Sequence, residues 1–366
     1  MDTIEYLMML KKINLLDMSP KKLLVFFNKL GECAFRSDQI MDWIYKKYCS
    51  DFNKMTNLHK DLRVKLNQIS EINAPIITHE QESSDGTRKW MMRIHDDKYV
   101  ETVYIPDNNR ATLCISSQSG CALGCSFCGT AKLGFIKNLR TSEIVGQVWR
   151  IARFISHYNK QQVKNCNNLI PITHIVFMGM GEPLLNLMNV VSSIQIILNS
   201  SGFNLSKHHV TLSTSGVVPG IDKLKDMVDV SLAVSLHAPN DVIRNKIMPI
   251  NKKYNIDCLL QSIRCYLQKT KSNNKKVTIE YVLLNRINDE IEHAHELAKK
   301  LITLPCKVNL MRWNSIKNIK YLKSTSDARL NNFYKVLKNY GIVTTIRKVR
   351  GADIHASCGQ LMGEIN

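Results

Sequence analysis

Six short apolar runs rich in β-branched residues alternate with stretches of helical periodicity from about residue 110 onward. The expected strands cover 111–117, 173–179, 209–215, 228–236, 276–284 and 306–313. The helical stretches that follow them cover 141–156, 186–200, 221–227, 255–268, 289–302 and 328–341. Strands joined by long helical crossovers lie parallel in one sheet. Because six units fall short of the eight in a closed barrel, the pattern predicts an α/β fold with a partial, open (β/α)6 TIM-like barrel over residues 108–345.

The residues before the barrel read as helical. Ser19 followed by Pro20 is a helix-start signal, and Gly31 ends the apolar pattern that begins there. A second helix is expected to start at Ser37 as its N-cap. We therefore expect an N-terminal helical accessory domain over residues 1–73.

A short β segment is expected to connect this accessory domain to the barrel. Two β-rich runs at 87–94 and 98–106 are separated by three polar residues, which is typical of a hairpin, here within a connection over 74–107. Residues 346–366 follow the last expected unit as a C-terminal segment. The sequence shows neither a secretory signal nor an apolar run of about 18 residues, so we expect no membrane association.

The chain is strongly basic, with 50 Lys and Arg residues against 31 Asp and Glu residues and a formal net charge of +19. A field of this size favours a polyanionic partner such as a nucleic acid. The charge is uneven, because residues 316–350 carry nine basic side chains and one acidic one, whereas residues 1–73 carry twelve and nine. A solvated basic surface without a partner is the alternative interpretation.

Eleven cysteines in a chain without a secretory signal point to a reducing compartment, so we expect a cytoplasmic protein. In such a compartment thiols serve metals or catalysis more often than structural disulfides. Three of the cysteines form a C-x3-C-x2-C pattern just after the first expected barrel strand, at Cys121, Cys125 and Cys128. The loops at this end of parallel strands carry the chemistry in α/β folds. This motif is therefore the candidate metal site.

Three close thiolates without a fourth suit an iron–sulfur cluster better than structural zinc. Structural zinc is four-coordinate, and the next cysteine, Cys166, has no C-x2-C partner and lies beyond a whole expected helix. A [4Fe–4S] cluster on three thiolates leaves one iron open for another ligand. Gly120 and Gly124 allow the loop to wrap closely around an inorganic core. Zinc with a distant fourth ligand is the alternative.

Five segments that contain these residues occur in a fixed order: "CISSQSGCALGCSFCGTAKLGF", "FMGMGEPLLN", "LSTSGVVP", "SLAVSLHAP" and "GADIHASCGQL". Together they resemble the radical S-adenosylmethionine superfamily and, within it, the dual-specificity RNA adenine-C2 methyltransferases, the RlmN family. The N-terminal "NLLDMSPKKLLVFFNKLGE" and "RSDQIMDWIYKK" resemble the same family. The resemblance therefore covers nearly the whole chain.

The resemblance implies a radical methylation of adenine C2, a carbon too electron-poor to attack a methyl group directly. In the family, one S-adenosylmethionine methylates a cysteine near the C-terminus, and a radical made from a second removes hydrogen from that S-methyl group. The methylene carbon adds to C2, and a second cysteine then resolves the adduct by forming a disulfide. The matching positions are Cys358 as methyl carrier and Cys114 as resolving cysteine, with Glu101 at the position of the family's proton acceptor.

The resemblance also implies the ligands and partners. The [4Fe–4S] cluster, one per chain, would sit on the three cysteines of the C-x3-C-x2-C motif. The S-adenosylmethionine contacts carry over to Gly181, Glu182, Ser213, Ser235, Leu236, His237 and Asn314. The implied partners are 23S rRNA and tRNA, together with an electron donor such as flavodoxin and its reductase. The implied form is a cytoplasmic monomer.

The sequence departs from the family pattern at two places and leaves two alternatives open. Gly129 stands where serine is more usual, and Ile136 where a polar residue is frequent. Neither change removes a cluster ligand or a catalytic thiol. A related adenine-C8 methyltransferase would share the cluster and both cysteines, although "GEPLLN" and the N-terminal segment favour C2. A non-catalytic Fe–S or zinc RNA-binding protein is the alternative from a different class.

Overall fold

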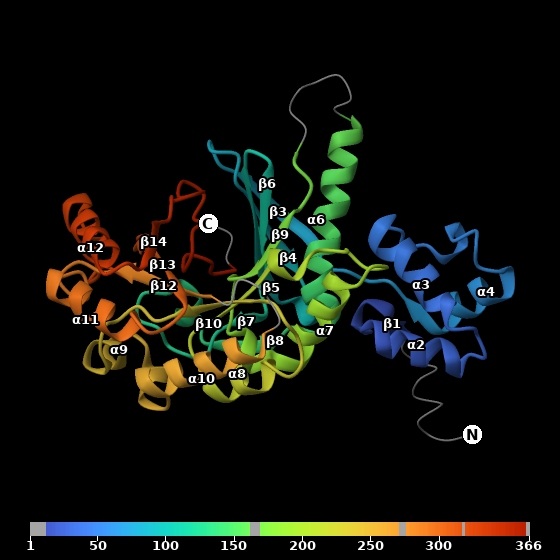
Figure 1. The fold of residues 1–366 in the computed structure, drawn as a ribbon. Coiled ribbons are helices and arrows are strands. Elements are labelled where there is room, and N and C mark those ends of the chain that lie inside the picture. Colours follow the sequence, from blue (N-terminus) through green and yellow to red (C-terminus); the bar gives the residue numbers. More distant parts are fainter. Residues whose placement is uncertain (1–11, 162–168, 271–275, 317–318, 364–366) are drawn as a thin grey trace.

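The computed structural model describes residues 12–161, 169–270, 276–316 and 319–363, so Cys166 lies outside the described residues. Figure 1 shows a curved sheet with helices on its outer side. A helical N-terminal unit lies at one end, and α12 (Asp327–Asn339) lies at the other. Among the described residues, no helix combines the length and apolar character needed to cross a bilayer.

Over its described residues, the N-terminal unit contains three α-helices, several short helical turns and two short strands. The helices are α2 (Pro20–Lys29), α3 (Phe35–Met41) and α4 (Lys60–Ile69), and the parallel strands are β1 (Ile13–Asn14) and β2 (Ser70–Glu71). Ser19 caps α2 as predicted, because its side chain accepts a hydrogen bond from the Lys22 N–H. The predicted N-cap at Ser37 is wrong. Helix α3 begins at Phe35, and the Ser37 hydroxyl lies within its first turn and donates to the Ala34 carbonyl.

The N-terminal unit shares a core with the first long helix of the barrel, α6 (Thr141–Gln161). Phe27 and Ile44 belong to the same apolar cluster as Val145 and Trp149 of α6. The buried Trp149 Nε1 donates to the Ile44 carbonyl at 2.7 Å, which satisfies the polar end of an otherwise apolar side chain. Helix α6 therefore holds the accessory unit against the barrel.

A ten-stranded sheet forms the centre of the described chain, in the order β14-β13-β12-β11-β10-β9-β6-β5-β4-β3. Its parallel strands are β6 (Arg110–Cys114), β9 (His174–Phe177), β10 (Val210–Thr214), β11 (Ser231–Ser235), β12 (Val277–Leu283), β13 (Cys306–Arg312) and β14 (Val343–Ile346). The crossover helices are α6, α7 (Leu187–Leu198), α8 (Val218–Leu224), α9 (Asp241–Ile247), α10 (Ile256–Lys269), α11 (Ile291–Leu301) and α12. The six predicted strands and the partial, open barrel are confirmed.

The sequence patterns miss the two edge strands of this sheet. β14 and β3 (Ile76–Glu82) are largely exposed, so neither carries the apolar run or the clean alternation that marks a buried strand. The predicted hairpin is confirmed as β4 (Arg88–Arg93) and β5 (Tyr99–Asp107), which pair antiparallel. Since β5 pairs in turn with β6, this hairpin continues the barrel sheet, with β5 beside the first barrel strand and β4 one strand further out.

Candidate active site

The cysteine loop is enclosed by a small antiparallel pair, β7 (Gln118–Gly120) and β8 (Phe135–Asn138). The Cys121 N–H donates to the Gly134 carbonyl at 2.8 Å, which closes the loop at its base. Gly120 has a φ of +70°, and a Cβ atom there would lie 1.9 Å from the Gly134 oxygen. Only glycine fits this close approach of the two chain segments. The geometry at Gly120 thus supports the tight loop that the sequence predicts.

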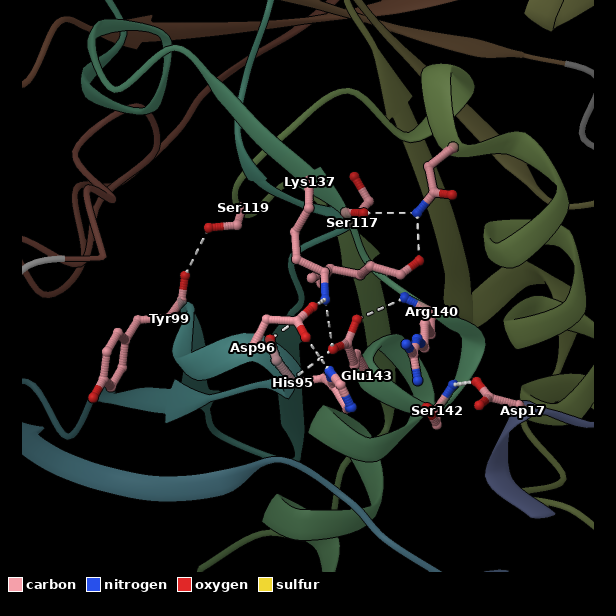
Figure 2. A network of polar contacts seen from close by, with 12 residues as sticks. Asp17, His95, Asp96, Tyr99, Ser117, Ser119, Lys137, Arg140, Ser142 and Glu143 are labelled. Carbon is pink, nitrogen blue, oxygen red and sulfur yellow. Dashed lines mark hydrogen bonds and ion pairs between the residues drawn. The ribbon is translucent and has the colours of Figure 1, made fainter. Parts of the chain in front are cut away.

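A polar network fixes the outer side of this hairpin, as Figure 2 shows. Lys137 of β8 lies between two carboxylates, at 3.0 Å from Asp96 and 3.3 Å from Glu143. Glu143, in the first turn of α6, also accepts the His95 N–H at 2.9 Å. Ser119 donates to the Tyr99 carbonyl at 3.1 Å. These contacts tie the strands that flank the cysteine loop to the turn between β4 and β5.

The three cysteines of the motif open onto one cavity of about 150 Å³ at the C-terminal ends of the barrel strands. Most of the predicted S-adenosylmethionine contacts line the same cavity: Gly181, Glu182, Ser213, Ser235, His237 and Asn314. Leu236 does not line it, because its side chain is fully buried and its N–H donates to the Glu280 carbonyl. The fold therefore brings together residues that lie almost 200 positions apart in the chain.

The donor set fits a cluster held by three thiolates. Burial raises the pKa of all three thiols, that of Cys121 to about 12, so three thiolates there need a positive partner. An iron–sulfur core supplies that charge. In the described part of the chain, no three His, Cys, Asp or Glu side chains converge closely enough to share one metal ion. The thiolates of a [4Fe–4S] cluster each bind a separate iron and do not need to converge.

Glu182 and Gly181 sit at the cavity wall after β9. Both Glu182 oxygens accept backbone hydrogen bonds, from Leu184 at 3.1 Å and from Ser215 at 2.8 Å. Gly181 has a φ of +94°, and a Cβ atom there would lie 2.4 Å from the Gln118 side chain. The structure therefore requires glycine at this position even before any ligand is considered.

His237 is a neutral ring that shapes the cavity. Burial, aided by the nearby Arg244, lowers the pKa of His237 to about 3. Its Nδ1 accepts the Val282 N–H at 3.0 Å, and its ring meets the Phe127 ring edge-to-face with centroids 4.9 Å apart. Phe127 lies between two cluster cysteines in sequence, so this contact couples the end of β11 to the cysteine loop.

Arg244 organises the strand ends, although no sequence pattern singles it out. Its buried guanidinium donates to three backbone carbonyls, those of Leu236, Ser215 and Ser235, at 3.0, 2.8 and 3.1 Å. Burial lowers the pKa of Arg244 to about 10, which still leaves it charged at neutral pH. Arg244 thus fixes the backbone around the predicted cofactor contacts on β10 and β11.

Cys114 and Cys358 line a second, larger cavity of about 530 Å³, and Cys358 also lines the first. Both are free thiols. Burial and the neighbouring Cys358 raise the pKa of Cys114 to about 12, against an opposing effect of Arg347, so Cys114 is protonated at neutral pH. Cys358 therefore lies between the cluster cysteines and the predicted resolving thiol.

Cys358 belongs to a C-terminal loop (residues 351–363) that rests directly on the cysteine loop. The Gly129 N–H donates to the Gly359 carbonyl at 2.6 Å, and the Thr130 hydroxyl donates to the Leu361 carbonyl at 2.6 Å. A Cβ atom on Gly129 would lie 3.0 Å from the Met362 side chain, tighter than ordinary van der Waals contact. Glycine at position 129, where serine is more usual in the family, thus suits the close packing of the C-terminal loop on the cysteine loop.

Glu101 lines neither cavity and instead binds the C-terminal loop through hydrogen bonds. It is 2% exposed, and its Oε1 pairs with Lys89 Nζ at 2.9 Å. Its Oε2 accepts the N–H groups of Met362 and Gly363 at 2.7 and 3.0 Å. Lys89 also donates to the His355 carbonyl at 3.4 Å. One buried ion pair thus holds the loop on both sides of Cys358.

The open parallel barrel, with a three-cysteine loop after its first strand, defines the radical S-adenosylmethionine class of enzymes. The family model of the Radical SAM superfamily matches residues 115–298. Residues 13–72 match the ribosomal RNA large subunit methyltransferase N-terminal domain. The chain therefore belongs to the radical S-adenosylmethionine methyltransferases of the RlmN type.

A solved structure agrees with this assignment. The chain is similar to a radical SAM methyltransferase from Sphaerobacter thermophilus, with a TM-score of 0.86 and 37% identity over 96% of this chain and 100% of that one. The chain is more distantly similar to SuiB from Streptococcus suis, with a TM-score of 0.44 and 14% identity over 66% of this chain and 51% of that one.

Proposed function

We propose that this protein methylates C2 of a specific adenine in 23S rRNA and in tRNA through an S-methylcysteine on Cys358, using two S-adenosylmethionine molecules per turnover. The observation that carries this proposal is the place of Cys358 on the walls of both cavities. From there one thiol faces the cluster cysteines on one side and Cys114 on the other. A binding protein without catalysis has no need for two thiols in this arrangement.

The chain's own residues have separate roles in this reaction. Cys121, Cys125 and Cys128 would hold a [4Fe–4S] cluster which, with S-adenosylmethionine bound, supplies the radical that activates the methylated Cys358. The S-adenosylmethionine would be oriented by the predicted contacts that line the smaller cavity: Gly181, Glu182, Ser213, Ser235, His237 and Asn314. The buried side chain of Leu236 does not reach this cavity. Cys358 takes the methyl group as a nucleophile and carries the carbon to C2. Cys114 resolves the adduct, because its sulfur bonds to the Cys358 sulfur as the Cys358 S–CH2 bond breaks and the released carbon takes up a proton to become the methyl group. The electron that started the reaction returns to the redox partner, and reduction of the disulfide restores both thiols. Glu101 accepts the C2 proton only if it gives up a present contact.

RNA and an electron donor complete the proposal. A reductant such as flavodoxin with its reductase would deliver the electron, and the enzyme would act as a cytoplasmic monomer, in keeping with its free thiols. Adenosines from the RNA of a deletion strain test the function, because 2-methyladenosine should be missing and should return with the intact gene. A loss of 8-methyladenosine instead would favour the related C8 methyltransferases.

The basic segment 316–350 is expected to bind RNA phosphates, with its member Lys317 outside the described residues. Lys335 and Lys338 are exposed on α12. Replacing both with Gln should flatten the dependence of RNA binding on salt, by roughly 0.9 in the log–log slope for each phosphate that the variant no longer neutralises. The measurement is RNA affinity across a salt series. Gln at the exposed Lys223 and Lys299, on α8 and α11, is the matched control. An unchanged slope would mean that the α12 lysines serve only solubility.

The Lys89–Glu101 pair is expected to position Cys358 for its methylation. Lys89→Met and Glu101→Gln should each lower S-methylation of Cys358 by about tenfold or more, because removing one partner of a buried pair leaves the other uncompensated. Lys89→Arg should restore part of it. Peptide mass spectrometry after incubation with S-adenosylmethionine, without RNA, measures this step, and hydrogen exchange over 351–363 reports the loop.

Glu143→Gln is the matched control for this prediction, since Glu143 is another buried carboxylate paired with a lysine (Figure 2). It should leave Cys358 methylation and loop exchange close to wild type. Full Cys358 methylation in Glu101→Gln, together with a protein–RNA adduct, would contradict the positioning role and leave Glu101 as the proton acceptor.

A further inference from the structure

The inner face of the barrel carries a row of polar side chains on four neighbouring strands. Ser235, Glu280, Asn309 and Thr345 are register partners on β11, β12, β13 and β14. Side chains of paired residues in parallel strands point to the same face of a sheet. Ser235 and Glu280 line the smaller cavity, and Glu280, Asn309 and Thr345 line the larger one. Glu280 is therefore the member of this row that faces both cavities.

The hydrogen bonds of this row end at Glu280. The Thr345 hydroxyl donates to Asn309 Oδ1 at 2.5 Å, and Asn309 Nδ2 donates to Glu280 Oε1 at 3.0 Å. The other carboxylate oxygen of Glu280, Oε2, is buried and accepts no hydrogen bond from the described residues. The side chain is only 3% exposed. A buried acceptor left without a donor is costly to a fold, and more so when it is charged.

The surroundings of Glu280 offset its charge without supplying that donor. Burial raises the pKa of Glu280, whereas Arg347 and Lys307 act against this shift, together with the hydrogen bond from Asn309. Arg347 lines both cavities, and Lys307 lines the larger one. The positive charges of Arg347 and Lys307 therefore stabilise the buried Glu280 carboxylate. Its Oε2 atom stays available to a ligand.

The other buried carboxylates near the site have no such free oxygen. Both oxygens of Glu182 accept backbone hydrogen bonds, and both oxygens of Glu101 are occupied by Lys89 and the C-terminal loop. Glu280 thus differs from Glu182 and Glu101 because one of its carboxylate oxygens has no hydrogen-bond donor among the described residues. It presents an unused acceptor to a space large enough for a ligand.

We propose that Glu280 is a further ligand-binding residue, whose Oε2 accepts a hydrogen bond from a ribose hydroxyl of an adenosine moiety. A carboxylate is a frequent acceptor for ribose hydroxyls in nucleotide sites, and such charge-assisted bonds are strong. The proposal rests on the proposed function, which offers two sources of the same chemistry. One is the adenosine of S-adenosylmethionine, and the other is the target nucleotide of the RNA.

Binding measurements on Glu280→Ala and Glu280→Gln separate the two sources. If the cofactor is bound, the dissociation constant for S-adenosylhomocysteine, measured by calorimetry on the reconstituted protein, should rise roughly 10- to 100-fold in Glu280→Ala, with RNA affinity unchanged. Glu280→Gln, which keeps the size but not the charge, should show a smaller rise. Thr344→Val is the matched control and should bind like wild type, because Thr344 also lies on β14 but lines neither cavity and donates to the Ile342 carbonyl.

If the RNA is bound, S-adenosylhomocysteine affinity should stay constant and RNA affinity should fall in Glu280→Ala. A single 2′-deoxyadenosine at the target position should then weaken wild-type binding by a similar factor and cause no further loss in Glu280→Ala. Wild-type affinities for both ligands in Glu280→Ala and Glu280→Gln, each with a cooperative thermal transition, would overturn the proposal. A wild-type protein that failed to bind S-adenosylhomocysteine would instead count against the proposed function itself.

Discussion

Replacing Cys114 with alanine is expected to leave the protein covalently attached to its RNA. The variant keeps Cys358, so it should still accept the methyl group and add its carbon to adenine C2. It lacks the thiol that would form the disulfide with Cys358 and release the product, so product formation should fall by about a thousandfold or more, on the scale set by losing a catalytic group. The measurement is a protein–RNA band on a denaturing gel.

Cys306 offers a matched control for Cys114, because it is also a buried cysteine on a barrel strand but lines neither of the two cavities. Cys306→Ala should turn over normally and form no band. The Cys114→Ala/Cys358→Ala double variant should also show none, because the methyl carrier is gone. Normal turnover of Cys114→Ala without a trapped adduct would refute the resolving role and make Cys114 an ordinary strand thiol.

Alanine at Cys121, Cys125 and Cys128 is expected to abolish iron binding. Anaerobic reconstitution of the wild-type protein should give about four irons per chain, as a [4Fe–4S] cluster requires. The triple variant should hold essentially none, because these thiols are the three that line the smaller cavity at the cysteine loop. Iron and sulfide analysis, together with the visible absorption of the cluster, measures the loss.

Cys258 and Cys265 on α10 provide the control, since they are free thiols on the outer helical layer. Alanine at both should leave the iron content at the wild-type level. The cluster assignment fails if the triple variant retains wild-type iron. Zinc in place of iron in the wild-type protein, after reconstitution with both metals, would favour the alternative of a zinc site.

The sequence predicted an element best where its own residues form a clear apolar run or a clear helical periodicity. β12 is buried along its whole length, so its apolar run stands out, and α10 shows helical periodicity between clear ends. β3 and β14 are short or exposed edge strands whose identity depends on the neighbour they pair with. The N-cap at Ser37 failed because a serine hydroxyl can bond back to a preceding carbonyl as readily as it caps a helix.

Part of the candidate site could be predicted in the same way. The cysteine spacing, the positive-φ glycines and the strand-end positions are local features, and the structure gathers most of those residues around one cavity. Lys89, Arg244 and Glu280 have no local signal, because each acts through partners distant in sequence or through the lack of one. Lys89, for example, meets the His355 carbonyl 266 residues away. Such roles become visible only when the fold places the partners together.

Glu101 illustrates the same limit for a residue that the sequence did single out. Its match to a proton acceptor came from the resemblance alone, whereas the fold occupies both of its oxygens with Lys89 and the C-terminal loop. A motif fixes which residue stands at a position but not which of its atoms are free. The free carboxylate oxygen in this region belongs to Glu280.

Deuterium in the methyl group of S-adenosylmethionine gives the most direct test of methylation through an S-methyl group on Cys358. The reconstituted enzyme would be supplied with reductant, unmodified RNA and S-adenosylmethionine whose methyl group carries three deuterium atoms, over several turnovers. Because a hydrogen atom must leave the S-methyl group of Cys358 before its carbon adds to the base, the product should be 2-methyladenosine with two of the three deuterium atoms. The third should appear in 5′-deoxyadenosine. A product that retains all three deuterium atoms would contradict transfer through the S-methyl group of Cys358. A product that carries the methyl group at C8 would contradict methylation of C2.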